Sequence, residues 1–369
     1  MPEIILQHVT KRFDKFVAVQ DLDLQIQDRG FITLLGPSGC GKTTTLRMIA
    51  GLETPTSGRI LIDGVPVFDS EKGINLPPNK RDIGFLFQNY ALWPHMTVYE
   101  NIAFGLEMLK WDKARIRKRV DELLVLLKIE QFEKRYPAEL SGGQQQRVAI
   151  ARTLAPSPKV LFMDEPLSNL DAKLRQEMRT ELKRLHSDTN STFVYVTHDQ
   201  LEAMTLSTKV CLMDTGVLQQ YAPPLEIYGH PANLFVAEFV GNPTMNFIPA
   251  TVKAADGNRA SLSLLGHDAT FTAKAPLGEL TGSAVLGVRP EFLPIVQGGP
   301  LRGKTYSTLP AGMETTVKLS CGGTMLTSVV FGCVDYAVDT ELPLNIVGDN
   351  IALFDQASGQ SVGFGSVTF

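Results

Sequence analysis

Nine residues near the start of the chain, "GPSGCGKTT" (36–44), have the composition and spacing of a loop that binds phosphate. Gly36, Gly41, Lys42 and Thr43 match the pattern G-x-x-x-x-G-K-[ST]. Glycines let backbone N–H groups turn toward a phosphate, and the start of a following helix adds partial positive charge. We expect Lys42 to reach the β- and γ-phosphates and the Thr43 hydroxyl to ligate Mg²⁺. An apolar run before the loop and a helix-like run after it supply the context that this motif requires.

Two carboxylates and a histidine end the apolar runs that come later in the chain. In "VLFMDEP" (160–166), Asp164 is placed to hold Mg²⁺ and Glu165 to act as general base or to position water. His198 ends the run "FVYVTH" and is expected to contact the γ-phosphate from the same sheet edge. A histidine after a strand is more often structural when it stands alone, but here the other parts of a phosphate site are present.

The stretch "LSGGQQQR" (140–147) predicts a second anion-binding helix start. Ser141 and Gln144 have capping-box spacing, and good helix-forming residues follow them. Gly142 and Gly143 fall in the first helical turn, where each glycine costs about 1 kcal/mol relative to alanine. Bare backbone at this place predicts that another group comes very close to it.

The elements that must position these residues are visible as patterns of apolar residues. The runs 31–36, 160–164 and 192–199 are typical of strands buried on both faces of a parallel sheet. Between the second and third runs, apolar residues recur at helical spacing and predict a helix: Leu174, Met178, Leu182 and Leu185. Residues 1–235 therefore read as an α/β domain, with a helical subdomain at about 90–155. From 243 to 369, short β-rich stretches and glycine turns predict a small all-β barrel of the OB type.

Composition sets broad limits on the class of protein. The chain has 369 residues, 44% hydrophobic and 20% charged, which suits two globular domains. A net charge of −4 argues mildly against nucleic-acid binding. The four cysteines form no CxxC pair, so a zinc site or a disulfide framework is not indicated. No run approaches the roughly 18 apolar residues of a membrane helix, so we expect a soluble protein whose membrane role depends on a partner.

These motifs, in this order and over nearly the whole chain, resemble those of the ATP-binding cassette (ABC) ATPases. Within that family the resemblance is to the ATPase subunits of bacterial solute importers for sugars, polyamines and iron(III). It is carried by "GPSGCGKTT", "FQNYALWPHMTVYENIAFGL" (87–106), "LSGGQQQR", "VLFMDEPLSNLD" (160–171) and "VTHD" (196–199). The resemblance implies a P-loop ATPase that works as a homodimer, in which the segment 140–147 faces the γ-phosphate of ATP on the other subunit. It also implies a regulatory β domain at the C-terminus, where "GVRPEF" (287–292) matches a family strand but ends in phenylalanine rather than histidine.

The resemblance also assigns individual residues. Phe13 matches the aromatic residue that stacks on adenine, although a phenylalanine in the core fits almost as well. Gln88 matches the residue that senses Mg²⁺ and the attacking water, so Glu165, His198 and Gln88 are the expected catalytic residues and Thr43, Gln88 and Asp164 the expected metal site. The segment Tyr90–Asn101 matches the surface that receives a permease subunit, and exposed Trp93 and Tyr99 would suit it, although both could also pack inward. Residues expected around ATP are Phe13, Gly36, Pro37, Ser38, Gly39, Cys40, Gly41, Lys42, Thr43, Thr44, Ser141, Gly142, Gly143, Gln144 and Asp171.

Proteins with an ABC ATPase domain of this kind serve three different functions, which are the alternatives for this chain. The first is the motor subunit of an importer on the cytoplasmic face of the bacterial inner membrane, working with permease subunits and, indirectly, an extracytoplasmic solute-binding protein. The solute is expected to be a sugar or polyol, with iron(III) or polyamine as alternatives. A DNA-repair ATPase would usually carry a long coiled-coil or zinc insertion between the phosphate loop and the 140–147 segment, whereas this chain has one compact helical segment and no cysteine pair there. A translation factor would carry two phosphate loops, whereas this chain has one. Finally, Cys40 lies at a helix start, which predicts a lowered thiol pKa and high reactivity, although a small filler residue is an equal alternative.

Overall fold

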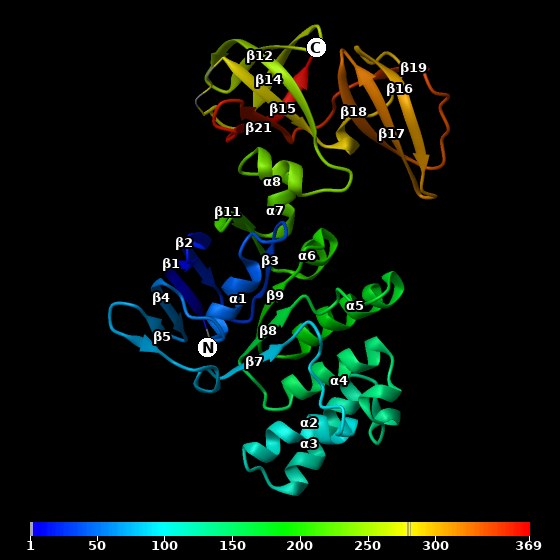
Figure 1. Cartoon of the computed structure of the whole chain (residues 1–369). Helices are drawn as coiled ribbons and strands as arrows, with labels where there is room; N and C mark the ends of the chain where they lie inside the picture. Colours follow the sequence, from blue (N-terminus) through cyan, green and yellow to red (C-terminus); the bar gives the residue numbers. More distant parts are fainter. Residues whose placement is uncertain (1–2, 279, 281) are drawn as a thin grey trace. The chain divides into compact units, whose positions relative to one another are not determined.

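The computed structural model describes residues 3–278, 280 and 282–369, which form two compact units, Met1–Pro224 and Leu225–Phe369. Figure 1 shows the course of the chain through both units. The first unit combines two sheets with a group of helices, and the second is mainly β. The α/β fold followed by an all-β barrel confirms the predicted fold class.

A six-stranded sheet forms the centre of the first unit, in the order β11-β10-β3-β9-β8-β7. Strands β10, β3, β9, β8 and β7 are parallel, and β11 pairs antiparallel with β10 at one edge. The bounds are β3 Phe31–Leu35, β7 Ile83–Leu86, β8 Val160–Asp164, β9 Thr192–Val196, β10 Lys209–Asp214 and β11 Val217–Ala222.

Side chains of this sheet alternate between two hydrophobic cores. Phe193 and Tyr195 of β9 pack in a core with the helices that follow β7 and β8. Val194 and Val196 point the other way, into a core shared with α1 (Lys42–Ala50). Because both faces are covered, the strands consist of almost continuous apolar residues, as the sequence predicts.

A second, five-stranded sheet in the order β2-β1-β4-β5-β6 packs on the α1 side. Its strands are β1 Ile4–Phe13, β2 Phe16–Ile26, β4 Ser57–Ile62, β5 Val65–Asp69 and β6 Ile74–Asn75. All pairings in this sheet are antiparallel, and the β1–β2 register shifts between Leu6 and Val9.

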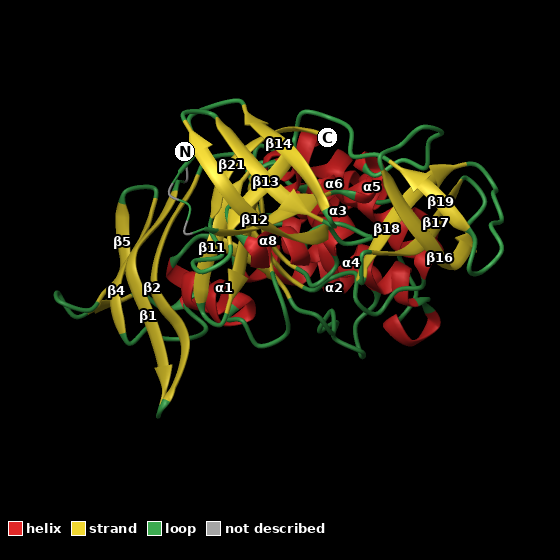
Figure 2. Cartoon of the chain, turned by 90° about the horizontal axis from the view of Figure 1, so that it is seen from above, coloured by secondary structure: helices red, strands yellow, loops and turns green. Residues whose placement is uncertain are grey.

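Helices α2 (Val98–Met108), α3 (Lys113–Leu126) and α4 (Gly142–Leu154) pack together in the core on the opposite face. The helices α5 (Ala172–Asp188) and α6 (Gln200–Leu206) follow β8 and β9 and contact one another. Figure 2 colours these helices red and the strands yellow.

In the second unit, two short helices, α7 (Pro224–Gly229) and α8 (Leu234–Phe239), precede a closed barrel with the order β12-β13-β14-β21-β20-β15. A four-stranded sheet, β18-β17-β16-β19, is inserted between β15 and β20 and shares one hydrophobic core with the barrel. The barrel strands are β12 Asn246–Asp256, β13 Arg259–Leu264, β14 His267–Ala273, β15 Ser283–Val288, β20 Ile351–Asp355 and β21 Ser361–Thr368. The inserted strands are β16 Leu301–Pro310, β17 Glu314–Cys321, β18 Thr324–Phe331 and β19 Glu341–Leu344.

Candidate functional site

The phosphate loop, residues 36–44, joins the end of β3 to the start of α1. A Cβ atom on Gly36 would lie 2.1 Å from the carbonyl oxygen of Met213, and one on Gly41 would lie 2.4 Å from that of Ala18. Both glycines also have positive φ angles, 147° and 99°, so packing and backbone conformation each require glycine there. Gly39, also at positive φ, has no atom within 4 Å of its Cβ position, which leaves the loop open on that side.

Lys42 folds back over the phosphate loop from the first residue of α1. Its Nζ donates to the carbonyl oxygens of Gly36 at 2.8 Å and Pro37 at 2.7 Å. The residue is only 5% exposed, and a buried ammonium group must keep polar partners. Phosphate oxygens could replace these carbonyls at little cost, so the cradle fits a nucleoside phosphate.

The predicted metal ligands Thr43 and Asp164 lie together. The Thr43 hydroxyl donates to Asp164 Oδ1 at 2.9 Å, and Arg47 Nη2 lies 3.4 Å from Asp164 Oδ2. Burial raises the pKa of Asp164, while the Thr43 hydrogen bond and the Arg47 charge oppose that rise. A hydroxyl and a carboxylate at this distance are hard oxygen donors of the kind that Mg²⁺ takes. The Arg47 contact was not predicted, although its position one helical turn after Thr43 places both on one face of α1.

Glu165 follows β8 in a left-handed backbone conformation, with φ 46°. Such a conformation in a residue other than glycine is uncommon and occurs preferentially at functional sites. The Glu165 N–H donates to the Val196 carbonyl at 3.1 Å, which fixes the turn against the end of β9. Its Oε2 lies 3.4 Å from Gln88 Nε2, and its Oε1 lies 3.5 Å from His198 Nδ1. The three residues predicted as catalytic therefore converge, and Glu165 lies between the other two.

Two residues to which the sequence motifs assign no role hold Gln88 in this group. Ser168 Oγ accepts from Gln88 Nε2 at 3.3 Å and donates to the Glu165 carbonyl at 2.9 Å. Asn169 Nδ2 donates to the Gln88 carbonyl at 3.2 Å. Both residues lie in "LSNLD", directly after the Glu165 motif, which was the available sequence signal.

The predicted capping box at the start of α4 is present. Ser141 Oγ accepts from the Gln144 N–H at 3.4 Å, and Gln144 Oε1 accepts from the Ser141 N–H at 2.9 Å. The two glycines between them differ. A Cβ on Gly143 would lie 2.5 Å from Leu174 Cδ2, whereas a Cβ on exposed Gly142 would meet nothing closer than Leu170 at 3.9 Å. Gly143 is thus explained by packing within its own chain, and only Gly142 presents open backbone.

The remaining predicted contacts to ATP are spread over the first unit. Apolar residues of α4 belong to the core on one face of the six-stranded sheet, and those of α1 to the core on the other face; Figure 1 shows the two helices apart. Asp171 is exposed and caps α5 through a 3.0 Å bond from the Leu174 N–H. Phe13 is 44% exposed at the end of β1, with Lys11 Nζ 4.5 Å from its ring centroid, so it is not a core residue.

The reactivity expected of Cys40 is wrong in this structure. The residue is 3% exposed, and burial raises the pKa of its thiol, with the neighbouring Lys42 charge opposing the rise only in part. Desolvation of the thiolate therefore outweighs the effect of the helix start. The small-filler interpretation of Cys40 agrees with its place in the core beside α1.

The segment 90–101 is fixed by a buried amide. Asn101 Nδ2 donates to the carbonyls of Trp93, Met96 and Thr97, and its Oδ1 accepts from the Trp93 N–H. Trp93 and Tyr99 are both partly buried, which agrees better with inward packing than with full exposure. The Trp93 ring packs against the Phe104 ring, and the two ring centroids lie 4.4 Å apart. Among the residues that the structure describes, none of the helices has the length and hydropathy of a membrane span.

Family models match two parts of the chain. Residues 19–168 match the model described as ABC transporter, and residues 241–293 match the MalK OB fold domain. The first match includes the phosphate loop, Gln88, the 140–147 segment and the Asp164–Glu165 pair. The second covers the first barrel strands.

Named relatives extend the similarity to the whole chain. The trehalose/maltose import ATP-binding protein MalK of Thermococcus litoralis is 44% identical over 98% of this chain and 100% of its own length. The spermidine/putrescine import ATP-binding protein PotA of Roseobacter denitrificans is 50% identical over 86% of this chain and 87% of its own.

Solved structures resemble the first unit. CbiO1 of Clostridium perfringens, part of the ABC transporter complex cbiONQ, has a TM-score of 0.56 and 32% identity, covering 61% of this chain and 89% of that one. A dimeric ATP-binding cassette in a post-hydrolysis state with ADP and Pi has a TM-score of 0.52 and 33% identity, covering 60% of this chain and 98% of that one. The phosphate cradle, the Glu165 group and these similarities agree: the chain belongs to the ABC transporter family and is an ATPase subunit of the importer type.

Proposed function

We propose that two copies of this chain form an importer motor with two composite ATP sites. In each site the phosphate loop of one copy and the start of α4 of the other enclose one ATP. The observation that carries this proposal is that the open helix start at Gly142 and the phosphate loop are separate: α4 packs in the core on one face of the sheet, and α1, which follows the phosphate loop, packs in the core on the other face. A similar ATP-binding cassette, whose solved structure is a dimer bound to ADP and Pi, supports a motor made of two copies.

Within each site, Lys42 and the loop amides would bind the β- and γ-phosphates. Thr43, Asp164 and Gln88 would hold Mg²⁺, which supplies charge neutralisation between the phosphates when bound. Glu165 would accept a proton from, or orient, the attacking water, and Gln88 and His198 would fix the Glu165 carboxylate from its two sides. Phe13 would stack on adenine, while Asp171 would meet the partner copy.

Closure and opening of the dimer would drive permease subunits at the cytoplasmic face of the membrane, where the motor is held peripherally. A groove of about 690 Å³ supports docking beside residues 90–101. Its lining includes Phe85, Trp93, Met108 and Leu109, of which Met108 is 64% and Leu109 55% exposed. Exposed apolar side chains gathered in a groove are typical of a protein contact.

The solute we propose is a sugar or polyol, delivered by an extracytoplasmic binding protein. The full-length similarity to a trehalose/maltose importer subunit and the MalK OB fold match support this choice. The similarity to a spermidine/putrescine importer subunit keeps a polyamine as the second candidate. Uptake of labelled maltose or trehalose against labelled spermidine, in cells with and without the gene, distinguishes the two.

The experiment that tests the motor function is Glu165→Gln. Glutamine preserves the size of the side chain but cannot accept a proton, so ATP binding should persist while hydrolysis falls by about 10²–10⁴. With hydrolysis blocked, the variant should elute as an ATP-dependent dimer in size-exclusion chromatography. Near-normal turnover would remove Glu165 from this role.

A further inference from the structure

One arginine links the turn before α5 to the loop after β9. Arg175 Nη2 donates to the Leu170 carbonyl at 3.1 Å, and Nη1 lies 3.4 Å from Asp199 Oδ2. Leu170 directly precedes Asp171, and Asp199 directly follows His198. The side chain is 32% exposed, so its contacts are partly shielded from water.

The far end of this link continues into a partly buried polar network that flanks His198. Asp199 Oδ1 accepts the N–H groups of Leu201 at 2.7 Å and Glu202 at 3.2 Å at the start of α6. Thr197 Oγ1 accepts the Asp199 N–H at 3.0 Å and donates to Glu202 Oε2 at 2.6 Å. Both residues that flank His198 are therefore held by side-chain hydrogen bonds.

Glu202 anchors this network in the core. It is 3% exposed, and its Oε2 also accepts from the Tyr195 hydroxyl at 2.8 Å. Burial raises the Glu202 pKa, and the Thr197 and Tyr195 hydrogen bonds oppose that rise. Arg175 Nε lies 4.0 Å from Glu202 Oε1, so the guanidinium group faces two carboxylates and one carbonyl at once. Because the donors of a guanidinium group lie in one rigid plane, Arg175 can fix the position of one loop relative to the other. The flexible ammonium group of a lysine could not do this.

We propose that Arg175 is a positioning residue that transmits the position of the Leu170–Asp171 turn to His198 in the same chain. This inference rests on the proposed function, in which Asp171 meets the partner copy and His198 contacts the γ-phosphate. When the partner moves the turn, Arg175 carries that displacement to Asp199 and thereby to His198. Hydrolysis in one site then depends on how the dimer is closed.

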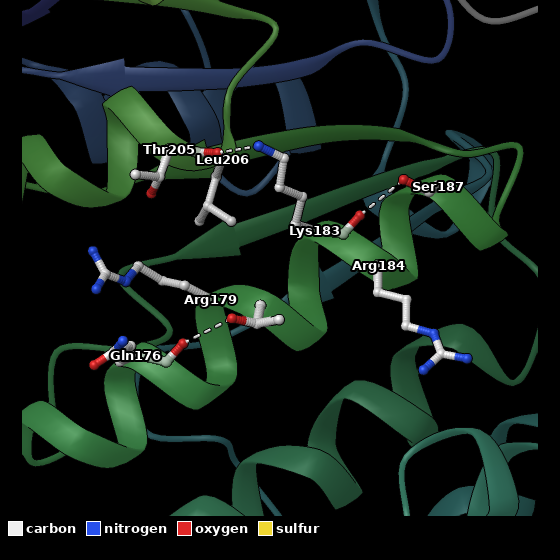
Figure 3. Close-up of a pocket in the computed structure, with 8 residues that line it drawn as sticks. Gln176, Arg179, Lys183, Arg184, Ser187, Thr205 and Leu206 are labelled. Carbon is white, nitrogen blue, oxygen red and sulfur yellow. Dashed lines mark hydrogen bonds between the residues drawn. The ribbon is translucent and has the colours of Figure 1, made fainter.

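Lys183 provides a matched control on the same pair of helices. Its Nζ donates to the Thr205 carbonyl at 2.8 Å and so also ties α5 to α6, as Figure 3 shows. It lies two helical turns beyond Arg175 and lines a groove of about 450 Å³ with Arg179 and Arg184. None of the groove residues was predicted for the ATP site. Replacing either Arg175 or Lys183 by alanine therefore removes a cationic contact to the α6 region. Of the two residues, Arg175 alone contacts both the Leu170–Asp171 turn and Asp199.

The test is a double-mutant cycle between Arg175→Ala and His198→Ala in the full-length chain. ATP affinity is measured by equilibrium binding and turnover by phosphate release. Arg175→Ala should lower kcat by about tenfold or more and change the Kd for ATP by less than about threefold. In the His198→Ala background, the same substitution should change kcat by less than about twofold, because Arg175 acts through His198. Lys183→Ala should leave both quantities within about twofold of the unmodified chain.

Equal losses of kcat for Arg175→Ala with and without His198, or an equal loss for Lys183→Ala, would overturn the proposal. Arg175→Gln, which keeps one donor for the Leu170 carbonyl, is measured in parallel. It takes the place of Arg175→Ala if the alanine variant does not fold. If His198→Ala itself leaves kcat unchanged, the role of His198 is wrong and this inference fails with it. The ATPase function is judged separately by Glu165→Gln, so the two failures are distinguishable.

Discussion

Alanine substituted at Gly142 and at Gly143, in separate variants, tests why the first turn of α4 contains two glycines. Both residues are helical, so alanine fits the backbone and gains up to about 1 kcal/mol of helix propensity. At Gly142 nothing opposes this gain, because the nearest atom to the new Cβ is 3.9 Å away. At Gly143 the new Cβ would lie 2.5–3.1 Å from three atoms of the Leu174 side chain, and overpacking of this kind costs about 1–3 kcal/mol.

The difference between the two variants should therefore be about 1–3 kcal/mol in favour of Gly142→Ala. For a unit of 224 residues, each kcal/mol shifts the Tm by about 2–4 °C, so the two Tm values should differ by about 2–12 °C. Differential scanning calorimetry without nucleotide measures this difference. In a Leu174→Ala background, which makes room for the new Cβ, the difference should nearly disappear. Equal Tm values, or a gap that survives Leu174→Ala, would refute the packing explanation of Gly143.

Three further predictions concern single residues of the site. Because the folded-state pKa of Asp164 is raised above its unfolded value, its charged form destabilises the fold at neutral pH. Asp164→Asn should thus raise the Tm there, by an amount that shrinks as the pH falls through the folded-state pKa; a gain independent of pH would contradict this. Buried Cys40 should be alkylated by iodoacetamide more slowly than exposed Cys333, and equal rates in a peptide map would show that Cys40 is accessible. Phe13→Ala should weaken ATP binding by about 1–3 kcal/mol while Phe13→Trp preserves it, and an unchanged Kd for the alanine variant would exclude stacking.

The parts of the fold that were predicted are those with a local pattern. Strands β3, β8 and β9 are short apolar runs, and Met178, Leu182 and Leu185 repeat at helical spacing on α5. The antiparallel sheet at the N-terminus was not predicted separately. Its β1–β2 pairing shifts register between Leu6 and Val9, and such irregularities interrupt the two-residue alternation that identifies a strand.

The same distinction applies to the site. The phosphate loop and the Asp164–Glu165 pair are contiguous motifs, so their residues could be named from the sequence alone. The contacts of Gly143 with Leu174, and of Arg175 with Leu170 and Asp199, join segments that the motifs treat as separate. Cys40 shows a different limit. The charge of a helix start is visible in the sequence, but the desolvation that outweighs it depends on the surrounding core.

The composite site in the dimer is tested most directly by mixing two variants, both carrying Glu165→Gln so that ATP-bound dimers persist. Lys42→Ala removes the phosphate-binding lysine, and Gly142→Asp places a carboxylate where the partner's γ-phosphate would sit. Gly142 is chosen for this substitution because a side chain at Gly143 would collide with Leu174 of its own chain.

Each variant alone has a defect in both composite sites, whereas the mixed dimer collects both defects in one site and leaves the other intact. Size-exclusion chromatography with ATP should therefore show a dimer in the mixture that exceeds the amount in either variant alone. Gly142→Asp should still bind ATP as an isolated chain. No additional dimer in the mixture, or loss of ATP binding by isolated Gly142→Asp, would contradict the assignment of α4 to the partner's ATP.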